Sequence, residues 1–97
     1  MKSDHLAVEL VIQTASGVLT GRFGPREAVT ILASQAPQAR GEAQLLIGRD
    51  PQQSEAYAQL LGSIAAELAA RVEGHDEARD MRAVLSELDR LVRALTA

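Results

Sequence analysis

Apolar side chains near the end of the chain recur at alternating steps of three and four residues, and this spacing constrains the fold most. Over residues 77–96 the repeat is carried by Ala78, Met81, Leu85, Leu88, Val92 and Leu95. Such steps place side chains along one edge of an α-helix, as in a heptad seam. Val84 and Leu91 lie beside the seam and widen it to the face that a bundle helix turns toward a core. The segment therefore predicts a long amphipathic helix packed against other helices.

A second long helix is predicted just before it, over residues 51–73. Asp50 offers an N-cap oxygen and Pro51 suits the first helical position, where a missing N–H costs nothing. Gly74 is expected to end this helix. Its inward positions are predicted to be Tyr57, Leu60, Leu61, Ile64, Leu68 and Val72. A short turn then leads into the last helix, so the C-terminal half should be a long helical hairpin.

Residues 4–20 are predicted to be a helix, with a β-hairpin as the alternative. One helical stripe would contain Val8, Val11, Ile12, Ala15, Val18 and Leu19. Residues 8–13 also alternate between apolar and polar types in part, as a strand would. We favour the helix because its stripe runs longer, with Ser3 or Asp4 as N-cap and Gly21 after its last turn.

The segment between these parts predicts a helix interrupted by proline. Pro25 suits the start of a helix over residues 25–35. Pro37 lacks a backbone donor and clashes with the preceding turn, so we expect it to break or kink the helix. A short helix over residues 38–47 would follow, ending at Gly48.

Lengths and connections together predict one helical domain spanning residues 1–97. At a rise of 1.5 Å per residue, the predicted segments are rods of about 25–34 Å. Rods of similar length joined by short loops favour an all-α, up-down four-helix-type bundle. The chain has 17 alanines, 13 leucines and only 2% aromatic residues, so its core should be aliphatic.

No group of residues points to catalysis, a cofactor or a metal, and we expect neither an enzyme nor a cofactor protein. The sequence has no cysteine, which excludes disulfides and thiolate ligands. The densest cluster of possible metal ligands, residues 73–77 around His75, crowds into one turn. There we expect Asp76 and Glu77 to favour the positive end of the last helix. His5 has no assignable acid or base partner and is expected to be solvated.

Composition also bears on location. Uninterrupted apolar runs reach three residues, which is too short for a membrane span or a signal sequence. Nine of the ten basic residues are arginines, which we interpret, with the alanine content, as bacterial codon bias. We expect a cytoplasmic bacterial protein without membrane contact or a small-molecule substrate.

The charge distribution argues against nucleic acid as a partner. Residues 1–48 carry four basic and four acidic groups, whereas residues 49–97 carry six basic and nine acidic groups. Nucleic-acid binders need a basic face to neutralise phosphates. The alternative that stays open is a small DNA-binding regulator with a helix-turn-helix-like segment over residues 28–47. Its groove-facing residues would be Arg40, Gln44 and Arg49.

The excess of apolar residues points toward a function. A helix that is apolar beyond one stripe is either deeply buried or covered by a partner. In a chain of 97 residues not every such side chain can be central. We therefore expect a protein that acts through protein–protein contacts, as an adaptor, a chaperone-like or immunity-like binder, or an accessory subunit. Its partner should include a second copy of itself, as a homodimer; a generous monomeric core is the alternative. The residues expected in the interface or core are Met81, Leu85, Leu88, Val92, Leu95, Leu6, Leu10 and Phe23.

Overall fold

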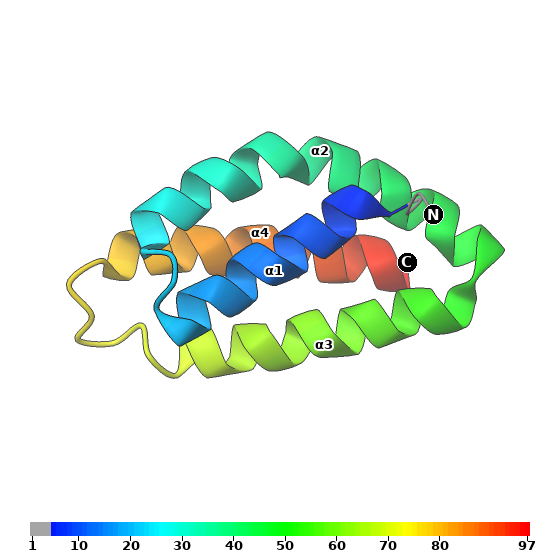
Figure 1. Cartoon of the computed structure of the whole chain (residues 1–97). Coiled ribbons are helices and arrows are strands. Elements are labelled where there is room, and N and C mark those ends of the chain that lie inside the picture. The colour runs from blue at the N-terminus through cyan, green and yellow to red at the C-terminus, as the bar shows by residue number, and fades with distance from the viewer. Residues whose placement is uncertain (1–4) are drawn as a thin grey trace.

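A computed structural model describes residues 5–97, which form four helices and no strand in that range (Figure 1). The bounds are α1 (Leu6–Thr20), α2 (Pro25–Arg49), α3 (Pro51–Ala69) and α4 (Ala78–Thr96). Successive helices run in opposite directions, so the predicted all-α, up-down four-helix bundle is confirmed. The first segment is a helix and not a hairpin, because its longer helical stripe becomes buried.

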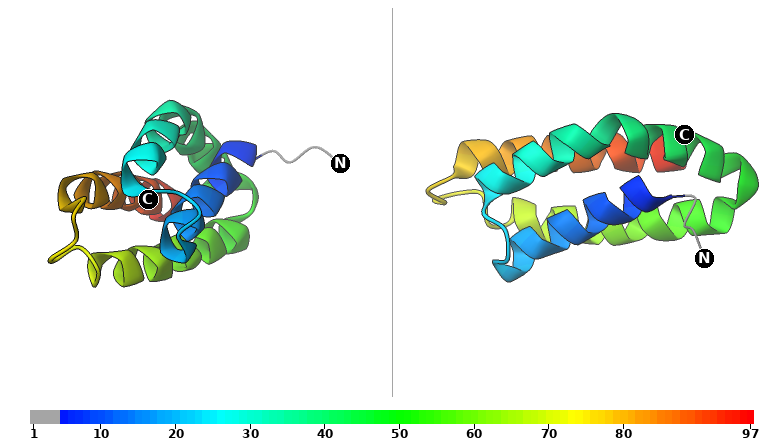
Figure 2. Two further views of the ribbon diagram at one scale, coloured as in Figure 1. Left: turned by 60° about the vertical axis from the view of Figure 1, so that its left-hand side comes forward. Right: turned by 45° about the horizontal axis from the view of Figure 1, so that its top comes forward.

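The helices do not follow chain order around the bundle. α2 packs extensively on both α1 and α4, and α3 packs on α4, while α1 and α4 barely touch. Figure 2 shows the order around the bundle as α1, α2, α4 and α3, with α1 opposite α4. α2 therefore has a neighbouring helix on each side, and a groove can form along each of those two seams.

The core is aliphatic, as the composition predicts. The largest side chains that are fully buried are Leu32, Leu61, Leu68, Leu88, Val8 and Val84. α2 faces the core mainly with small residues, among them Ala28, Ala36, Ala39 and Ala43. Small side chains let a helix approach its neighbours closely, and this is how α2 can pack against two helices at once.

The predicted break at Pro37 is wrong. α2 is continuous through Pro37, so the separate helices over residues 25–35 and 38–47 are one. The missing N–H of Pro37 leaves the carbonyl of Ala33 without its helical partner, but both residues are exposed and water can take that bond. α2 packs against α1 on one side and α4 on the other, and this packing holds the helix together. Figure 1 shows α2 bowed along its length.

The helix ends differ from prediction mainly around α3. α3 ends at Ala69 rather than at residue 73, and Gly48 lies inside α2 instead of ending it. Gly74 does adopt the left-handed conformation, with φ 79°, but within the connector beyond α3. Leu60 is 47% exposed and not inward, because its neighbour Leu61 occupies the core-facing position.

Two predicted caps are confirmed. The Oδ1 atom of Asp50 accepts a hydrogen bond of 3.1 Å from the Gln53 N–H at the start of α3. Gly21 follows α1 with φ 82°, the left-handed conformation that glycine adopts without strain. Ser3 and Asp4, the predicted N-caps of the first helix, lie outside the described residues.

Candidate functional site

The apolar seam of α4 lies in the core of its own chain. Met81, Leu88 and Leu95 are each exposed by 2% or less. Leu85 and Val92 are half-buried and pack against the same core. The seam therefore builds the bundle, and it leaves no freely exposed apolar strip on α4 for a partner.

The second group of expected contact residues lies on a surface. Leu6 is 55% exposed, and Leu10 and Phe23 are half-buried. Leu10 and Phe23 line one groove with Ile12 and Ile31, formed by α1, the connector after it and α2, with a volume of about 710 Å³. Leu6 stands one turn before Leu10 on the same side of α1. The structure thus places these three residues along one side of α1, with Leu10 and Phe23 in the same groove.

Leu45 extends this surface at the end where α1 begins. It is 60% exposed and lines a smaller depression together with His5 and Glu42. Of the three large hydrophobic side chains that are exposed among residues 5–97, two lie here and the third, Leu60, lies on α3. We refer to the whole surface as the α1–α2 face, defined by Leu6, Leu10, Ile12, Phe23, Ile31 and Leu45.

Gly17 allows Phe23 to pack in this face. The N–H groups of Arg22 and Phe23 both donate to the Gly17 carbonyl, at 2.8 and 3.2 Å, which folds the connector back on α1. A Cβ atom at position 17 would collide with the Phe23 ring. Because glycine has no side chain, the ring can lie against the helix backbone. No signal in the sequence paired these two residues.

α1 is capped by a side chain from another helix. The two carboxylate oxygens of Glu42, on α2, accept hydrogen bonds from the N–H groups of Ala7 at 3.1 Å and Val8 at 3.0 Å. The residue at the N-cap of α1, His5, makes no capping bond through its side chain. A carboxylate at this position satisfies free N–H groups and meets the positive end of the helix dipole. It also fixes where α1 begins against α2, and hence the shape of the α1–α2 face.

His5 and Tyr57 form an aromatic contact at the same end of the bundle. Their rings meet edge to face with centroids 5.2 Å apart, so His5 is half-buried and not simply solvated. Burial raises the pKa of Tyr57, and the negative charges of Glu9 and Glu42 raise it further. His5, Glu42 and Tyr57 thus form a cluster where α1, α2 and α3 meet. Among residues 5–97, no three His, Asp or Glu side chains gather as a metal site would require.

The turn before α4 is held by His75. The Glu77 N–H donates to Nδ1 of His75 at 2.9 Å, whereas the side chain of Glu77 makes no capping bond. Glu77 is the N-cap residue of α4 and Asp76 precedes it, so both carboxylates lie at the positive end of that helix; their effect on its dipole stays a prediction. Asp76 is exposed, and no hydrogen bond joins it to this turn.

The helix-turn-helix alternative loses the element on which it depended. Residues 28–47 belong to one continuous helix, so no turn separates a recognition helix from a supporting one. Gln44 and Arg49 are exposed on α2, but Arg40 is half-buried in the gap between α2 and α4.

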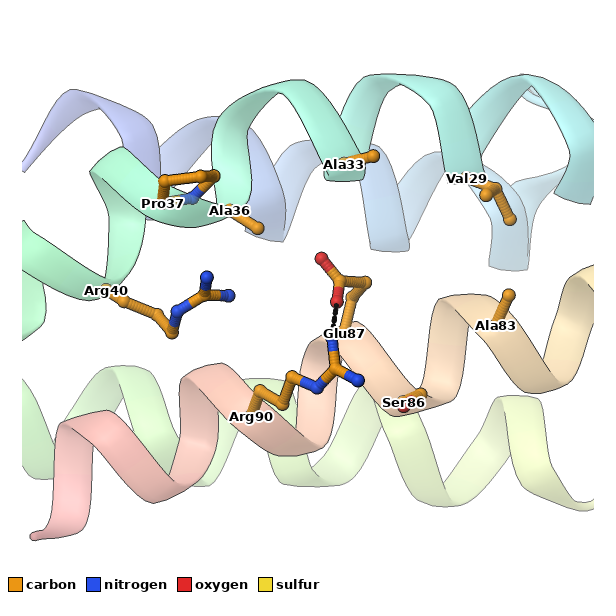
Figure 3. A pocket seen from close by; sticks show the side chains of 9 residues that line it. All are labelled: Val29, Ala33, Ala36, Pro37, Arg40, Ala83, Ser86, Glu87 and Arg90. Carbon is orange, nitrogen blue, oxygen red and sulfur yellow. Dashed lines mark hydrogen bonds and ion pairs between the residues drawn. The ribbon is translucent and has the colours of Figure 1, made fainter.

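That gap is a second groove, on the other side of α2 from the α1–α2 face (Figure 3). Its volume is about 400 Å³. Its uncharged walls are Val29, Ala33, Ala36 and Pro37 from α2, and Ala83 and Ser86 from α4. Three charged residues, Arg40, Glu87 and Arg90, complete the lining. Nη1 of Arg90 lies 2.7 Å from Oε1 of Glu87 in an ion pair. We refer to this surface as the α2–α4 groove.

Comparison with known proteins supplies no relative from which a function could be transferred. No protein-family model, curated protein or solved structure matches the chain. Within residues 5–97, no helix is both long enough and apolar enough to cross a membrane. The bacterial origin and cytoplasmic location expected from composition stay predictions.

Proposed function

We propose that the protein acts through protein–protein contact and not through catalysis, and that its α1–α2 face binds a second copy of the chain. The homodimer would serve as an adaptor or an accessory subunit. The observation that carries this proposal is a groove lined by half-buried Leu10 and Phe23, with exposed Leu6 one turn before Leu10 and exposed Leu45 in the depression at the start of α1. Exposed apolar side chains that cluster, unlike scattered ones, mark a surface that a partner covers.

Charge favours a second copy as the occupant. The groove in the α1–α2 face has one charged lining residue, Arg22, at the connector end. The depression at the opposite end carries Glu42, Arg49 and Asp50, which leave one net negative charge there. In a two-fold, antiparallel pairing the Arg22 end of each copy would face the acidic end of the other. Such a pairing brings no like charges together along the apolar middle.

The size of the molecule also suits a dimer that uses one long face. The bundle measures 41 × 21 × 19 Å. A standard interface buries roughly 800 Å² on each partner. The longest face of this bundle is of that order, so a stable dimer would cover most of the α1–α2 side.

Sedimentation velocity over a range of concentrations tests the proposal, with a double variant and a matched control. Leu6→Ser combined with Leu45→Ser removes two exposed leucines from the face without opening the core. Since a buried leucine contributes about 1.5–3 kcal/mol, the double variant should dimerise at least tenfold more weakly. Leu60→Ser, which changes the exposed leucine on α3, should leave dimerisation unchanged.

Two results would reject the proposal. One is a wild-type chain that sediments as a monomer up to millimolar concentration. The other is a dimer that Leu60→Ser weakens as much as the double variant does.

A further inference from the structure

The α2–α4 groove contains a guanidinium group that the described part of the chain does not neutralise. Figure 3 shows the Arg40 side chain extending from α2 toward α4, while Glu87 is engaged by Arg90. The Glu87 side chain is 16% exposed and that of Arg90 is 62% exposed. Arg40 is half-buried and makes no hydrogen bond or ion pair with residues 5–97. A partly desolvated cation of this kind favours an anionic partner.

The walls of the groove suit a helix rather than a small ion. From Val29 to Arg40 the groove follows 12 residues of α2, whose 11 steps span about 16 Å or three helical turns. Alanines on both walls allow another backbone to approach closely. Beneath Arg40 and Glu87 a small void remains, with room for about one water molecule. The apolar residues around that void are Val11, Leu32, Ala36, Ala39 and Leu91.

We propose that the α2–α4 groove binds an amphipathic helix of a partner protein, which places one carboxylate against Arg40 and small aliphatic side chains against the alanine walls. Charge complementarity selects this occupant. The lining carries two arginines and one glutamate and is net positive, although the whole chain has a net charge of −3. A nucleic acid would need several unpaired cations along the groove, but the groove offers only Arg40. The groove and the α1–α2 face lie on different sides of α2, so this inference does not depend on dimerisation.

A displayed library of helical 16-residue peptides with randomised surface positions supplies the probe. Selection against the wild-type protein should enrich sequences that contain Asp or Glu with aliphatic residues three or four positions away. The tightest selected peptide is then synthesised, together with a form in which its acidic residue is replaced by the matching amide. Fluorescence anisotropy should show the amide form binding at least tenfold more weakly.

Two variants locate the binding site, and one serves as control. Arg40→Gln removes the free charge, and Ala33→Trp fills the groove from an exposed position. Each should weaken the selected peptide at least tenfold. Arg93→Gln removes an exposed arginine that pairs with Asp89 outside the groove, and it should have no effect. Circular dichroism shows that each variant is folded, and sedimentation shows separately whether it still dimerises.

The proposal is overturned if no peptide is enriched, if the enriched peptides lack an acidic residue, or if they bind the Arg40→Gln and Ala33→Trp variants as tightly as the wild type. It is also overturned if a labelled DNA duplex of 20 base pairs displaces the peptide from the groove at physiological salt, because the free cation would then serve nucleic acid.

Discussion

The first and last helices are both rich in apolar residues, but they differ in the kind of residue that stays exposed to water. α4 carries seven charged residues, most of them on its outer side, and its apolar side is covered by the rest of the chain. α1 carries one charged residue, Glu9, and the chain buries its Val8, Val11 and Ala15 stripe. The flank of α1 that includes Leu6 and Leu10 is left partly uncovered.

This contrast separates two meanings of an apolar helix. In α4 the apolar and charged sides are sharply divided, and the other helices of the bundle cover the apolar side. In α1 the division is weak, since uncharged residues such as Gln13 and Ser16 border the apolar flank. The periodicity of a helix indicates which side is buried in its own chain. The residues that flank this side indicate whether further apolar surface is left for another molecule to cover.

The largest effect should come from truncating the α4 seam. Leu88 is completely buried, so Leu88→Ala should lower the free energy of unfolding by about 2–5 kcal/mol, through lost burial and the cavity left behind. Leu6→Ala, at an exposed position of α1, should change it by less than about 0.5 kcal/mol when the protein is dilute. Urea denaturation at low concentration measures both. Equal losses would erase the contrast between the two helices.

A smaller loss is expected where the connector packs on α1. Gly17→Ala places a methyl group into the Phe23 ring, which must move, and the unfolding free energy should fall by about 1–3 kcal/mol. Gly41→Ala provides the matched control, because an added methyl group there meets nothing within 4 Å. That variant should be more stable by about 0.5–1 kcal/mol, as alanine favours helix over glycine. Thermal melts of the two variants should therefore shift in opposite directions.

Removing the carboxylate that caps α1 should act mainly on α1 itself. Glu42→Ala should lower stability by about 1–2 kcal/mol, because the amides of Ala7 and Val8 lose their acceptors. Amide hydrogen exchange should show those two positions exchanging faster. Glu55→Ala removes an exposed carboxylate that contacts Gln59 on the same helix, and it should leave α1 unchanged. Unaltered exchange at Ala7 and Val8 in the Glu42 variant would show that the cap does not hold this helix.

The smallest effect concerns Tyr57, the single tyrosine of the chain, whose ionisation can be followed by its ultraviolet absorbance. Its pKa should lie above 10.0, chiefly because of burial, and Glu42→Gln should lower it while leaving it raised. Since the pKa is higher in the folded than in the unfolded state, stability that is present below pH 10 should be lost as the pH rises above it. An ordinary pKa in the wild type would contradict the contact between α1 and α3 at this end.

The sequence was sufficient to predict the helices and most of the core. Spacing identified the α4 seam, and local residue types identified the Asp50 and Gly21 caps. Pro37 misled the prediction because its local cost was outweighed by the packing of α2 against helices on both sides. Local rules could not include that packing.

The candidate surfaces were predictable only in part. The sequence predicts Leu6, Leu10 and Phe23 as interface or core residues, but their placement beside Ile31 and Leu45 depends on how α1 lies across α2. The position of α1 depends in turn on Glu42, which lies 35 residues from Ala7 in the chain. Interactions over such distances leave no local pattern in a single sequence.

The chain has no cysteine, so a single introduced thiol can report directly on which side of the molecule a second copy covers. Ser16→Cys places a thiol in the groove of the α1–α2 face, and Arg82→Cys places one on the exposed side of α4. The rate of maleimide labelling is measured as protein concentration rises. We expect labelling at position 16 to slow at least fivefold while position 82 stays unchanged. Labelling at position 16 that is independent of concentration, or protection at position 82 instead, would contradict the account.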